Sequence, residues 1–558
     1  MRAAPWYLPA FMCPSARARW FAARHLVAGA VGLVLSAVGC ASSSEGGEAE
    51  ATILLSRCEG VGVAELQCGV LRVEENREQP NGHQIELEIV VAPSTSRTPA
   101  SDPVFFLAGG PGQGAAALAP MIVSRFDAIR RERDMVFVDL RGTGGSGPLR
   151  CDVEDPDDLG ELLGASFDVT KLDGCVAEFA AAGVDPTQYT TAAMIDDLDE
   201  VRAGLGYGQV NLLGISYGTL AAQVYMRRHA SRVRSAVLDG VVPTDSSVSL
   251  AMPSNFERAL KLAFADCRED RGCAAAYPGL ERKLAQVLRD LDENRALEAF
   301  NHPRTGAPTR VEISREGFVH VLGGTLYSSQ FAALVPLLIE RAYVGDWGPV
   351  AAVALRTAQQ SKTVSTGLYL SVACAEELAG VDEAARREAT AGLEFFDDHP
   401  LEQLEQACAR WPHAEIDAGF HEPISSDVPT LLLSGRYDPV TPPKLAEQLA
   451  ERLGDARHVT VDAVSHGVWH NGCAPELIAD FFAAPDPAAL DSSCLDGLAR
   501  PGVFLSPNGP WTIAKGQGAD APVLDAEPES DAESDAEADS NSGSALAQGE
   551  PLGGRAEP

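Results

Sequence analysis

Gln209-Val-Asn-Leu-Leu-Gly-Ile-Ser-Tyr-Gly-Thr-Leu220 joins a short apolar run to a serine between two glycines and then to the start of a periodic apolar segment. The run at 210–213 predicts a buried strand, and the apolar spacing over 220–226 predicts a helix. Gly214-Ile-Ser-Tyr-Gly218 between them predicts a sharp turn that exposes a serine hydroxyl. A Cβ at either glycine would collide with the neighbouring strand or helix, so this pattern favours Ser216 as a nucleophile.

Composition limits the classes of function. The 558 residues are 45% hydrophobic, which suits one large domain with insertions, or two domains, plus tails. The formal net charge of −35 argues against a nucleic-acid partner, because phosphate binding needs clustered Lys and Arg.

The first 40 residues are predicted to be a lipoprotein-type signal peptide. Arginines precede an apolar segment at 26–38 that is too short for a comfortable membrane span. The segment ends at Ala37-Val-Gly-Cys40, which resembles a bacterial lipobox, so Cys40 is the predicted lipidation site and the only expected link to a membrane. A plain signal peptide and an uncleaved anchor are the alternatives. In each case we expect the mature protein to be exported, facing the periplasm or the cell exterior.

Ten cysteines follow Cys40, an even number that predicts disulfides outside a reducing compartment. A metal site is disfavoured because no paired Cys-x-x-Cys arrangement has histidines nearby. Sequence alone leaves the connectivity open. Pairing neighbours along the chain suggests Cys58–Cys68, Cys151–Cys175, Cys267–Cys273, Cys374–Cys408 and Cys473–Cys494.

Apolar runs alternate with helical patterns before and after a long middle region, which predicts an α/β fold with a mainly parallel sheet covered on both faces. In the middle region, apolar residues recur at helical spacing over 255–267, 280–297, 316–343 and 347–358, which predicts a mostly helical cap inserted between sheet strands. The predicted segments are a signal peptide (1–40), a flexible tether (41–55), the first part of the core (56–245), the cap (246–422), the second part of the core (423–512) and an acidic disordered tail (513–558).

A nucleophilic serine needs a base, and the base needs an orienting acid. In a fold of this kind the acid and the histidine follow the serine along the chain. Asp438 stands just past a predicted strand at 429–434, and His466 stands in a loop beyond a predicted strand at 457–461. Asp438 and His466 are therefore the expected acid and base. Asp462 and His470 are the weaker rivals, because Asp462 precedes His466 closely and His470 lies further into the next predicted helix.

A tetrahedral oxyanion needs N–H donors. One donor is expected from Tyr217, which follows the serine, and the other from the loop Gly109-Gly-Pro-Gly112 after an earlier strand. Gly110 is the preferred second donor and Gly109 the alternative. A phosphate-binding loop is excluded because no Lys-Ser/Thr pair ends this stretch.

Together these motifs resemble the prolyl and tripeptidyl aminopeptidase family of α/β-hydrolases. The resemblance covers about residues 56–500 and depends on Gly109–Gly112, Asp139-Leu-Arg-Gly-Thr-Gly144, Gly214–Thr219, Asp438 and His466. Cys267 and Cys273, before Tyr277-Pro278, fit the secreted tripeptidyl branch. Ala108 stands where prolyl aminopeptidases usually have a histidine, which disfavours release of single prolines. Asp139 and Arg141 are expected to hold the loop beneath the site.

Membership of this family implies that acidic residues of the cap bind the free N-terminus of a substrate. The candidates lie in Cys374-Ala-Glu-Glu377, after the apolar run 368–372, with Glu376 as the main carboxylate and Glu377 as the second. Physically, an α-ammonium group in a partly closed cleft needs a carboxylate partner. The alternative is that both are ordinary surface carboxylates on a solvated helix.

The predicted function is an exported serine exopeptidase that releases short peptides or amino acids from free peptide N-termini through an acyl-enzyme. A carboxylesterase or lipase with the same three residues is the alternative, because a fold does not fix a substrate. A non-catalytic peptide-binding surface lipoprotein is a third interpretation. Neither a cofactor nor a metal is implied.

Overall fold

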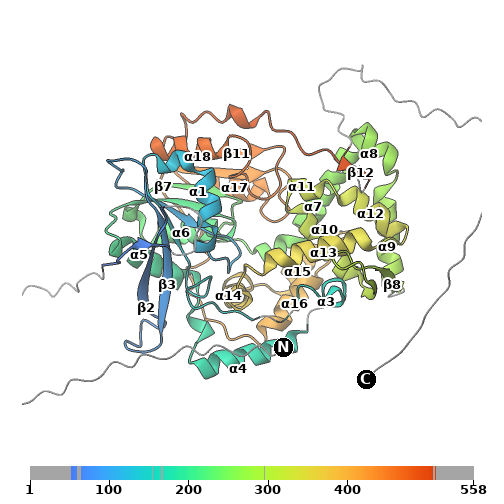
Figure 1. Ribbon diagram of the computed structural model, residues 1–558, viewed down its shortest axis with the longest axis horizontal. Helices are drawn as coiled ribbons and strands as arrows, with labels where there is room; N and C mark the ends of the chain where they lie inside the picture. The colour runs from blue at the N-terminus through green and yellow to red at the C-terminus, as the bar shows by residue number, and fades with distance from the viewer. Residues whose placement is uncertain are drawn as a thin grey trace, which may run out of the picture. The chain divides into compact units, whose positions relative to one another are not determined.

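A nine-stranded sheet is built from the first and last parts of the chain in the computed structural model (Figure 1). The structure describes residues 52–58, 65–151, 153, 155–164, 168–293, 296–506 and 509–510. Cys40, the predicted signal peptide, most of the predicted tether and all of the predicted tail lie outside them. The strands are β1 (Ser56–Arg57), β2 (Gln67–Glu74), β3 (Gln84–Ala92), β4 (Val104–Leu107), β5 (Met135–Val138), β6 (Val210–Ile215), β7 (Val233–Asp239), β10 (Thr430–Gly435) and β11 (Ala456–Val461).

The order across the sheet is β1-β2-β3-β5-β4-β6-β7-β10-β11. Strands β1 to β3 form an antiparallel meander that also pairs antiparallel with β5, and the remaining six strands are mutually parallel. The loop between β2 and β3 contains Asn81-Gly82, and Asn81 takes a positive φ of 71° there. The expectation of a mainly parallel sheet is confirmed.

Helices cover both faces of the sheet because side chains of each strand alternate between two apolar clusters. Phe105 and Leu107 of β4 pack with one cluster, whereas Val104 and Phe106 pack with the other. The first cluster lies under α5 (Thr191–Gly204), α6 (Tyr217–Arg228) and α17 (Pro443–Ala450), and the second under α1 (Ala119–Arg125), α2 (Asp127–Arg130) and α18 (Ala474–Ala483).

Between β7 and β10 the chain forms the cap, which has its own apolar cluster; its helices α9, α10, α12 and α13 gather together in Figure 1. Its elements are α7 (Val248–Glu269), α8 (Arg271–Ala276), α9 (Leu280–Glu293), β8 (Ala296–Asn301), β9 (Pro308–Ile313), α10 (Arg315–Leu326), α11 (Ser329–Ala332), α12 (Val335–Tyr343), α13 (Gly348–Ser361), α14 (Thr366–Val372), the single-turn π-helix η5 (Ala373–Glu377), α15 (Glu383–Thr390) and α16 (His399–Cys408).

Two details of the cap differ from the helical pattern. The helix predicted over 280–297 ends at Glu293, and residues 296–313 form an antiparallel hairpin of β8 and β9. The short helix α3 (Leu159–Leu163) packs in the cap cluster, although it precedes in sequence the turn Gly214–Gly218 that carries Ser216, here called the elbow. The carbonyl of Leu163 accepts a hydrogen bond from the N–H of Ser314 at 2.8 Å, which joins α3 to the start of α10. The predicted segment boundaries stay predictions.

All five suggested cysteine pairs form disulfides, so the pairing of neighbours along the chain is confirmed. The Cys374–Cys408 bridge joins η5 to the end of α16 and so braces the turn that carries the two candidate glutamates. Within the described residues, no helix combines the length and apolarity needed to cross a membrane.

Candidate active site

Ser216 lies at a strained turn between β6 and α6. Its φ and ψ are 57° and −124°, in a region of backbone conformation that residues other than glycine rarely adopt. The flanking glycines leave the space that this turn needs, because a Cβ at Gly214 would lie 2.5 Å from the carbonyl oxygen of Gly218. A Cβ at Gly218 would lie 2.2 Å from the carbonyl oxygen of Leu107 in β4. Packing of the elbow against the sheet therefore positions the serine.

Asp438 and His466 meet at the carboxyl ends of neighbouring strands. Asp438 follows β10, His466 follows β11, and 2.7 Å separates the His466 Nδ1 from the Asp438 Oδ2. The N–H groups of Val440 and Thr441 donate to the other carboxylate oxygen, Oδ1, at 2.9 Å and 2.8 Å. Asp438 is thus a fully buried carboxylate whose oxygens all have donors.

The two pKa values shift in the directions that this pair requires. Burial alone would raise the pKa of Asp438, but the imidazole of His466 and the two backbone N–H groups outweigh it and lower the pKa. Burial likewise opposes a charged imidazole, but the adjacent Asp438 carboxylate raises the pKa of His466 above its ordinary value. The site therefore favours an imidazolium next to a carboxylate.

Asp239, at the end of β7, is a further buried acid that the sequence patterns did not identify. Its carboxylate accepts hydrogen bonds from the N–H groups of Val468 at 3.0 Å and Trp469 at 2.6 Å, and its carbonyl accepts one from the N–H of Ser216 at 2.8 Å. Asp239 therefore ties the elbow to the loop that carries His466. Burial raises its pKa to about 6. An aspartate that ends a buried strand is the only signal that the sequence offered.

The rivals of the expected acid and base lie elsewhere. Asp462 is exposed and approaches Arg436 at 3.7 Å. The ring of His470 packs edge-on against Trp469, with their ring centres 4.7 Å apart.

The cap contacts the expected base, His466, directly. The carbonyl of Tyr327 accepts a hydrogen bond from the N–H of His466 at 3.0 Å, and the two rings lie edge to face. No hydrogen bond joins Ser216 to His466 among the described residues, a looseness that is common before substrate binds.

The loop after β4 lies against the serine. A Cβ at Gly109 would lie 3.1 Å from the Ser216 Cβ, and Gly110 has a φ of +114° that favours glycine. The N–H of Tyr217 is the first of α6, so it has no acceptor within the helix. Gly109, Gly110 and Tyr217 thus line the same cavity as Ser216, and which N–H of the glycine loop donates stays a prediction.

The motif Asp139–Gly144 holds the loop after β4 from beneath. The Asp139 carboxylate accepts hydrogen bonds from the N–H groups of Ala116 at 2.7 Å and Gly145 at 2.8 Å. Arg141 is buried in a two-bond contact with Asp197, with distances of 2.6 Å and 2.7 Å. These contacts fix the loops beneath the site.

Glu376 and Glu377 lie on the cap side, and each is held by a different partner, one from the core helix α5 and one from the cap helix α7. Glu376 is 2% exposed and accepts hydrogen bonds from the Thr191 N–H at 2.7 Å and the Thr191 hydroxyl at 2.6 Å. Glu377 accepts hydrogen bonds from the N–H of Ser249 at 3.0 Å and from its hydroxyl. Burial raises the pKa of both, that of Glu376 to about 7. Glu376 is therefore no ordinary surface carboxylate, because its side chain is buried and bonded to Thr191.

The serine, the imidazole and both glutamates line one cavity of about 720 Å³, here called the shared cavity. Apolar side chains such as Met252, Phe420 and Trp469 form much of its wall. Such an enclosed site with a few convergent polar groups is typical of binding sites for small ligands. The part of the chain that the structure describes contains no group of three or more His, Cys, Asp or Glu side chains that could hold a metal ion, and the absence of a cofactor stays a prediction.

Family models match both halves of this site. Residues 102–271, with the elbow, match a model described as the alpha/beta hydrolase fold, and residues 394–494, with Asp438 and His466, match one described as TAP-like protein. The fold expected from the sequence and the resemblance to this family are confirmed.

Curated relatives match over most of the chain. The serine protease Hip1 of Mycobacterium tuberculosis is 25% identical over 463 residues, covering 76% of this chain and 87% of that protein. The tripeptidyl aminopeptidase of Streptomyces lividans is 25% identical over 459 residues, covering 77% and 83%. A protein of M. tuberculosis named carboxylesterase B is 27% identical over 462 residues, covering 75% and 84%.

Proposed function

We propose that this chain, an α/β-hydrolase related to the prolyl and tripeptidyl aminopeptidases, is an exported serine exopeptidase that releases short peptides from free peptide N-termini. The observation that carries the proposal is the shared cavity, where Ser216 and His466 lie with the buried carboxylates of Glu376 and Glu377. The relatives named serine protease and tripeptidyl aminopeptidase support the choice of peptides as substrates. The five disulfides support export, because such bonds persist in oxidising compartments. Lipidation at Cys40 is part of the proposal.

In the proposed reaction the Ser216 hydroxyl attacks the scissile carbonyl while His466 takes its proton. Asp438 stabilises the resulting imidazolium, and the N–H groups of Tyr217 and Gly110 bind the oxyanion. His466 then protonates the leaving amine, and water hydrolyses the acyl-enzyme. The contact between the His466 Nδ1 and the Asp438 Oδ2 supports the roles of base and acid.

The glutamates would select the free N-terminus. An α-ammonium group pairs with a desolvated carboxylate, and a blocked N-terminus would leave that carboxylate buried without a cationic partner. The hydrogen-bond chain from the Tyr217 hydroxyl through Thr191 to Glu376 would fix the carboxylate relative to the serine.

The test compares tripeptidyl chromogenic amides with free and acetylated N-termini. We expect cleavage of the free forms, little cleavage of the acetylated ones, and loss of both in Ser216→Ala. Equal rates on free and acetylated amides would exclude the exopeptidase.

An esterase is the second candidate, because a relative of similar identity is named carboxylesterase B. Short acyl esters should be assayed beside the amides. Turnover of esters without any turnover of the free tripeptidyl amides would favour the esterase.

A further inference from the structure

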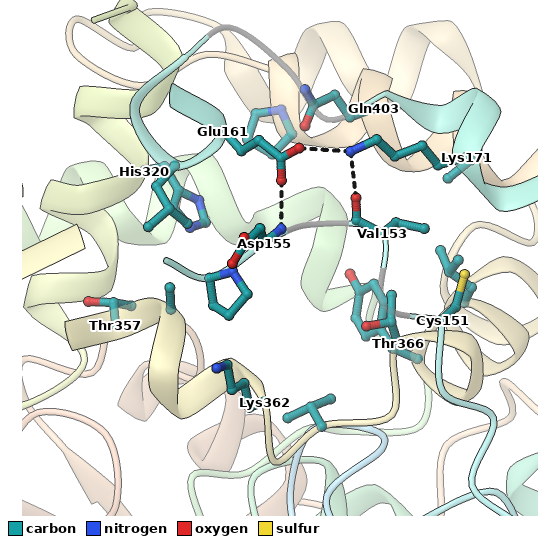
Figure 2. A pocket seen from close by; sticks show the side chains of 18 of the residues that line it. Cys151, Val153, Asp155, Glu161, Lys171, His320, Thr357, Lys362, Thr366 and Gln403 are labelled. Carbon is teal, nitrogen blue, oxygen red and sulfur yellow. Dashed lines mark hydrogen bonds and ion pairs between the residues drawn. The ribbon is translucent and has the colours of Figure 1, made fainter. Parts of the chain in front are cut away.

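A second cavity, of about 1020 Å³, is lined by the segment around 150–171 and by the cap helices α10, α13, α14 and α16 (Figure 2). Lys171 there bonds to the Glu161 carboxylate and to the Val153 carbonyl, each at 2.8 Å, as the dashed lines of Figure 2 show. Residues 152, 154 and 165–167, which adjoin this wall in sequence, lie outside the described residues. The lysine is engaged by the protein itself, and the contacts that link the cap to the catalytic residues lie on α7 instead.

The turn after β10 carries Asp438, and its N–H groups bond to the core. The N–H of Arg436 donates to the carbonyl of Val461 at the end of β11, and the N–H of Tyr437 donates to the carbonyl of Val464, both at 3.0 Å. The N–H of Asp438 closes the turn on the strand that precedes it. One side of the turn is therefore fixed to the segment that leads to the expected base.

The carbonyl groups of the same turn bond to the cap. The Arg258 Nη1 donates to the carbonyl of Arg436 at 2.9 Å, and the Arg258 Nη2 donates to the carbonyl of Asp438. A guanidinium is planar and presents its donors in a fixed fork, so one side chain holds both carbonyls in register. Burial lowers the pKa of Arg258, and the nearby Asp438 carboxylate opposes this shift. Within the described residues no carboxylate forms an ion pair with Arg258, so both of its hydrogen bonds serve the turn.

Two further residues of α7 anchor the helix beside the turn. The side-chain amide of Asn255 donates to the carbonyl of Val440 at 3.0 Å. Near the other end of α7, Asp266 accepts a hydrogen bond from the Tyr437 hydroxyl at 2.9 Å and pairs with Arg500, whose guanidinium lies 3.6 Å from the centre of the Tyr437 ring. At 3.6 residues per turn, both anchors lie on the same helix face as the arginine. The helix is thus held against the turn at three places.

The position of this turn decides whether the acid reaches the base. Only 2.7 Å separates the His466 Nδ1 from the Asp438 Oδ2, and a misplacement of about 1 Å in a catalytic constellation can cost about 10²-fold in rate. Arg258 does not line the shared cavity, so it is placed to act through Asp438 and not on the substrate.

We propose that Arg258 is a positioning residue whose guanidinium holds the turn of Asp438 and thereby fixes the hydrogen bond between Asp438 and His466. The inference rests on the proposed function, in which Asp438 is the catalytic acid. It gives the cap a part in the chemistry as well as in recognition.

The first test replaces the guanidinium in two steps. Arg258→Met keeps the apolar stem and loses both hydrogen bonds, so we expect kcat for the free tripeptidyl amide to fall about ten- to a hundredfold, with KM and the preference for free over acetylated amides unchanged. Arg258→Lys keeps the charge but not the fork, so its kcat should lie between those of Arg258→Met and the wild type. Arg268→Met is the matched control and should keep wild-type kinetics, because Arg268 is an exposed arginine of the same helix that pairs with Glu281 at 2.6 Å. A rise in KM with kcat kept in Arg258→Met would overturn the inference.

The second test separates positioning of the acid from a general loosening of the fold. Arg258→Met is combined with Asp438→Asn, and kcat is measured for both single variants and the double one. If Arg258 acts through Asp438, we expect its replacement to change kcat by less than about twofold once the acid is gone. Losses that multiply in the double variant would overturn the inference, because a loosened fold lowers activity in either background. Failure of the proposed function looks different, since the wild type would not cleave the free tripeptidyl amide or Asp438→Asn alone would keep wild-type kcat.

Discussion

The shared cavity has two walls: a core wall that carries Ser216 and His466, and a cap wall that carries Glu376 and Glu377. The two walls position these side chains by different physical means. On the core wall, backbone geometry does so: the left-handed φ of Ser216 and the contacts of Gly214 and Gly218 admit few residue types. On the cap wall, Glu376 and Glu377 lie on a π-turn, and each is held by the N–H and hydroxyl of one partner residue. The proposed chemistry on the core wall therefore leaves a sequence motif, whereas the proposed recognition on the cap wall requires only charge and burial.

Removal of the Ser216 hydroxyl should cause the largest loss of activity. In Ser216→Ala we expect kcat to fall about 10⁴- to 10⁶-fold, because no other group on the core wall can form the acyl-enzyme. Steady-state kinetics on the tripeptidyl amide measures this fall, with thermal unfolding to show that the fold is kept. Activity near that of the wild type would show that the core wall is not the catalytic one.

Disruption of the Asp438–His466 pair should cause the next largest loss of activity. Asp438→Asn keeps the shape but loses the charge that stabilises the imidazolium, so we expect kcat to fall about 10⁴-fold. Asp462→Asn is the matched control, because Asp462 is an exposed aspartate just after β11, the strand that precedes His466. Similar losses in both variants would contradict the assignment of the acid.

The contrast between the core wall and the cap wall also explains which features could be predicted from the sequence. The elbow, the loop after β4 and the strand ends that carry Asp438 and His466 depend on local patterns of apolar residues and glycine, and all were expected. Asp239 was missed because its contacts, with Ser216 and with residues 468 and 469, join segments distant in sequence.

The cap was predicted less well for a related reason. Its helical periodicity continues into a β-hairpin at 296–313, and α3 joins it from the other side of the elbow. Helical spacing identifies an apolar face but not the surface that buries it. The burial of Glu376, which distinguishes it from a surface glutamate, is a property of that packing and has no local pattern.

The bridge that braces the recognition wall offers a third prediction, on stability. Cys374→Ala with Cys408→Ala opens a loop of 34 residues in separation, and we expect unfolding to cost about 2–4 kcal/mol less. Denaturant unfolding measures this loss. Because the bridge is anchored in η5, KM for free tripeptidyl amides should rise more than kcat falls. A larger loss in kcat than in KM would mean that the cap wall also positions the chemistry.

Neutralising the main recognition carboxylate should produce a smaller but selective effect. In Glu376→Gln we expect kcat/KM for free N-terminal substrates to fall about ten- to a hundredfold, since a hydrogen bond to a buried charge is lost. Turnover of acetylated amides should stay as low as before. Glu388→Gln, an exposed cap glutamate, is the control. An equal fall for acetylated substrates would give Glu376 a structural role only.

The smallest effect is a pH dependence confined to recognition. Because burial raises the pKa of Glu376 to about 7, this carboxyl is mostly neutral at pH 6 and mostly charged at pH 7.5. Only the charged form pairs with an α-ammonium group, whose own pKa of about 8 leaves most of it protonated at pH 7.5. We therefore expect the ratio of kcat/KM for free over acetylated amides to rise about fivefold between pH 6 and 7.5. Titration of His466 affects both substrates alike and cancels in the ratio, so a slope that persists in Glu376→Gln would have to come from another group on the cap wall.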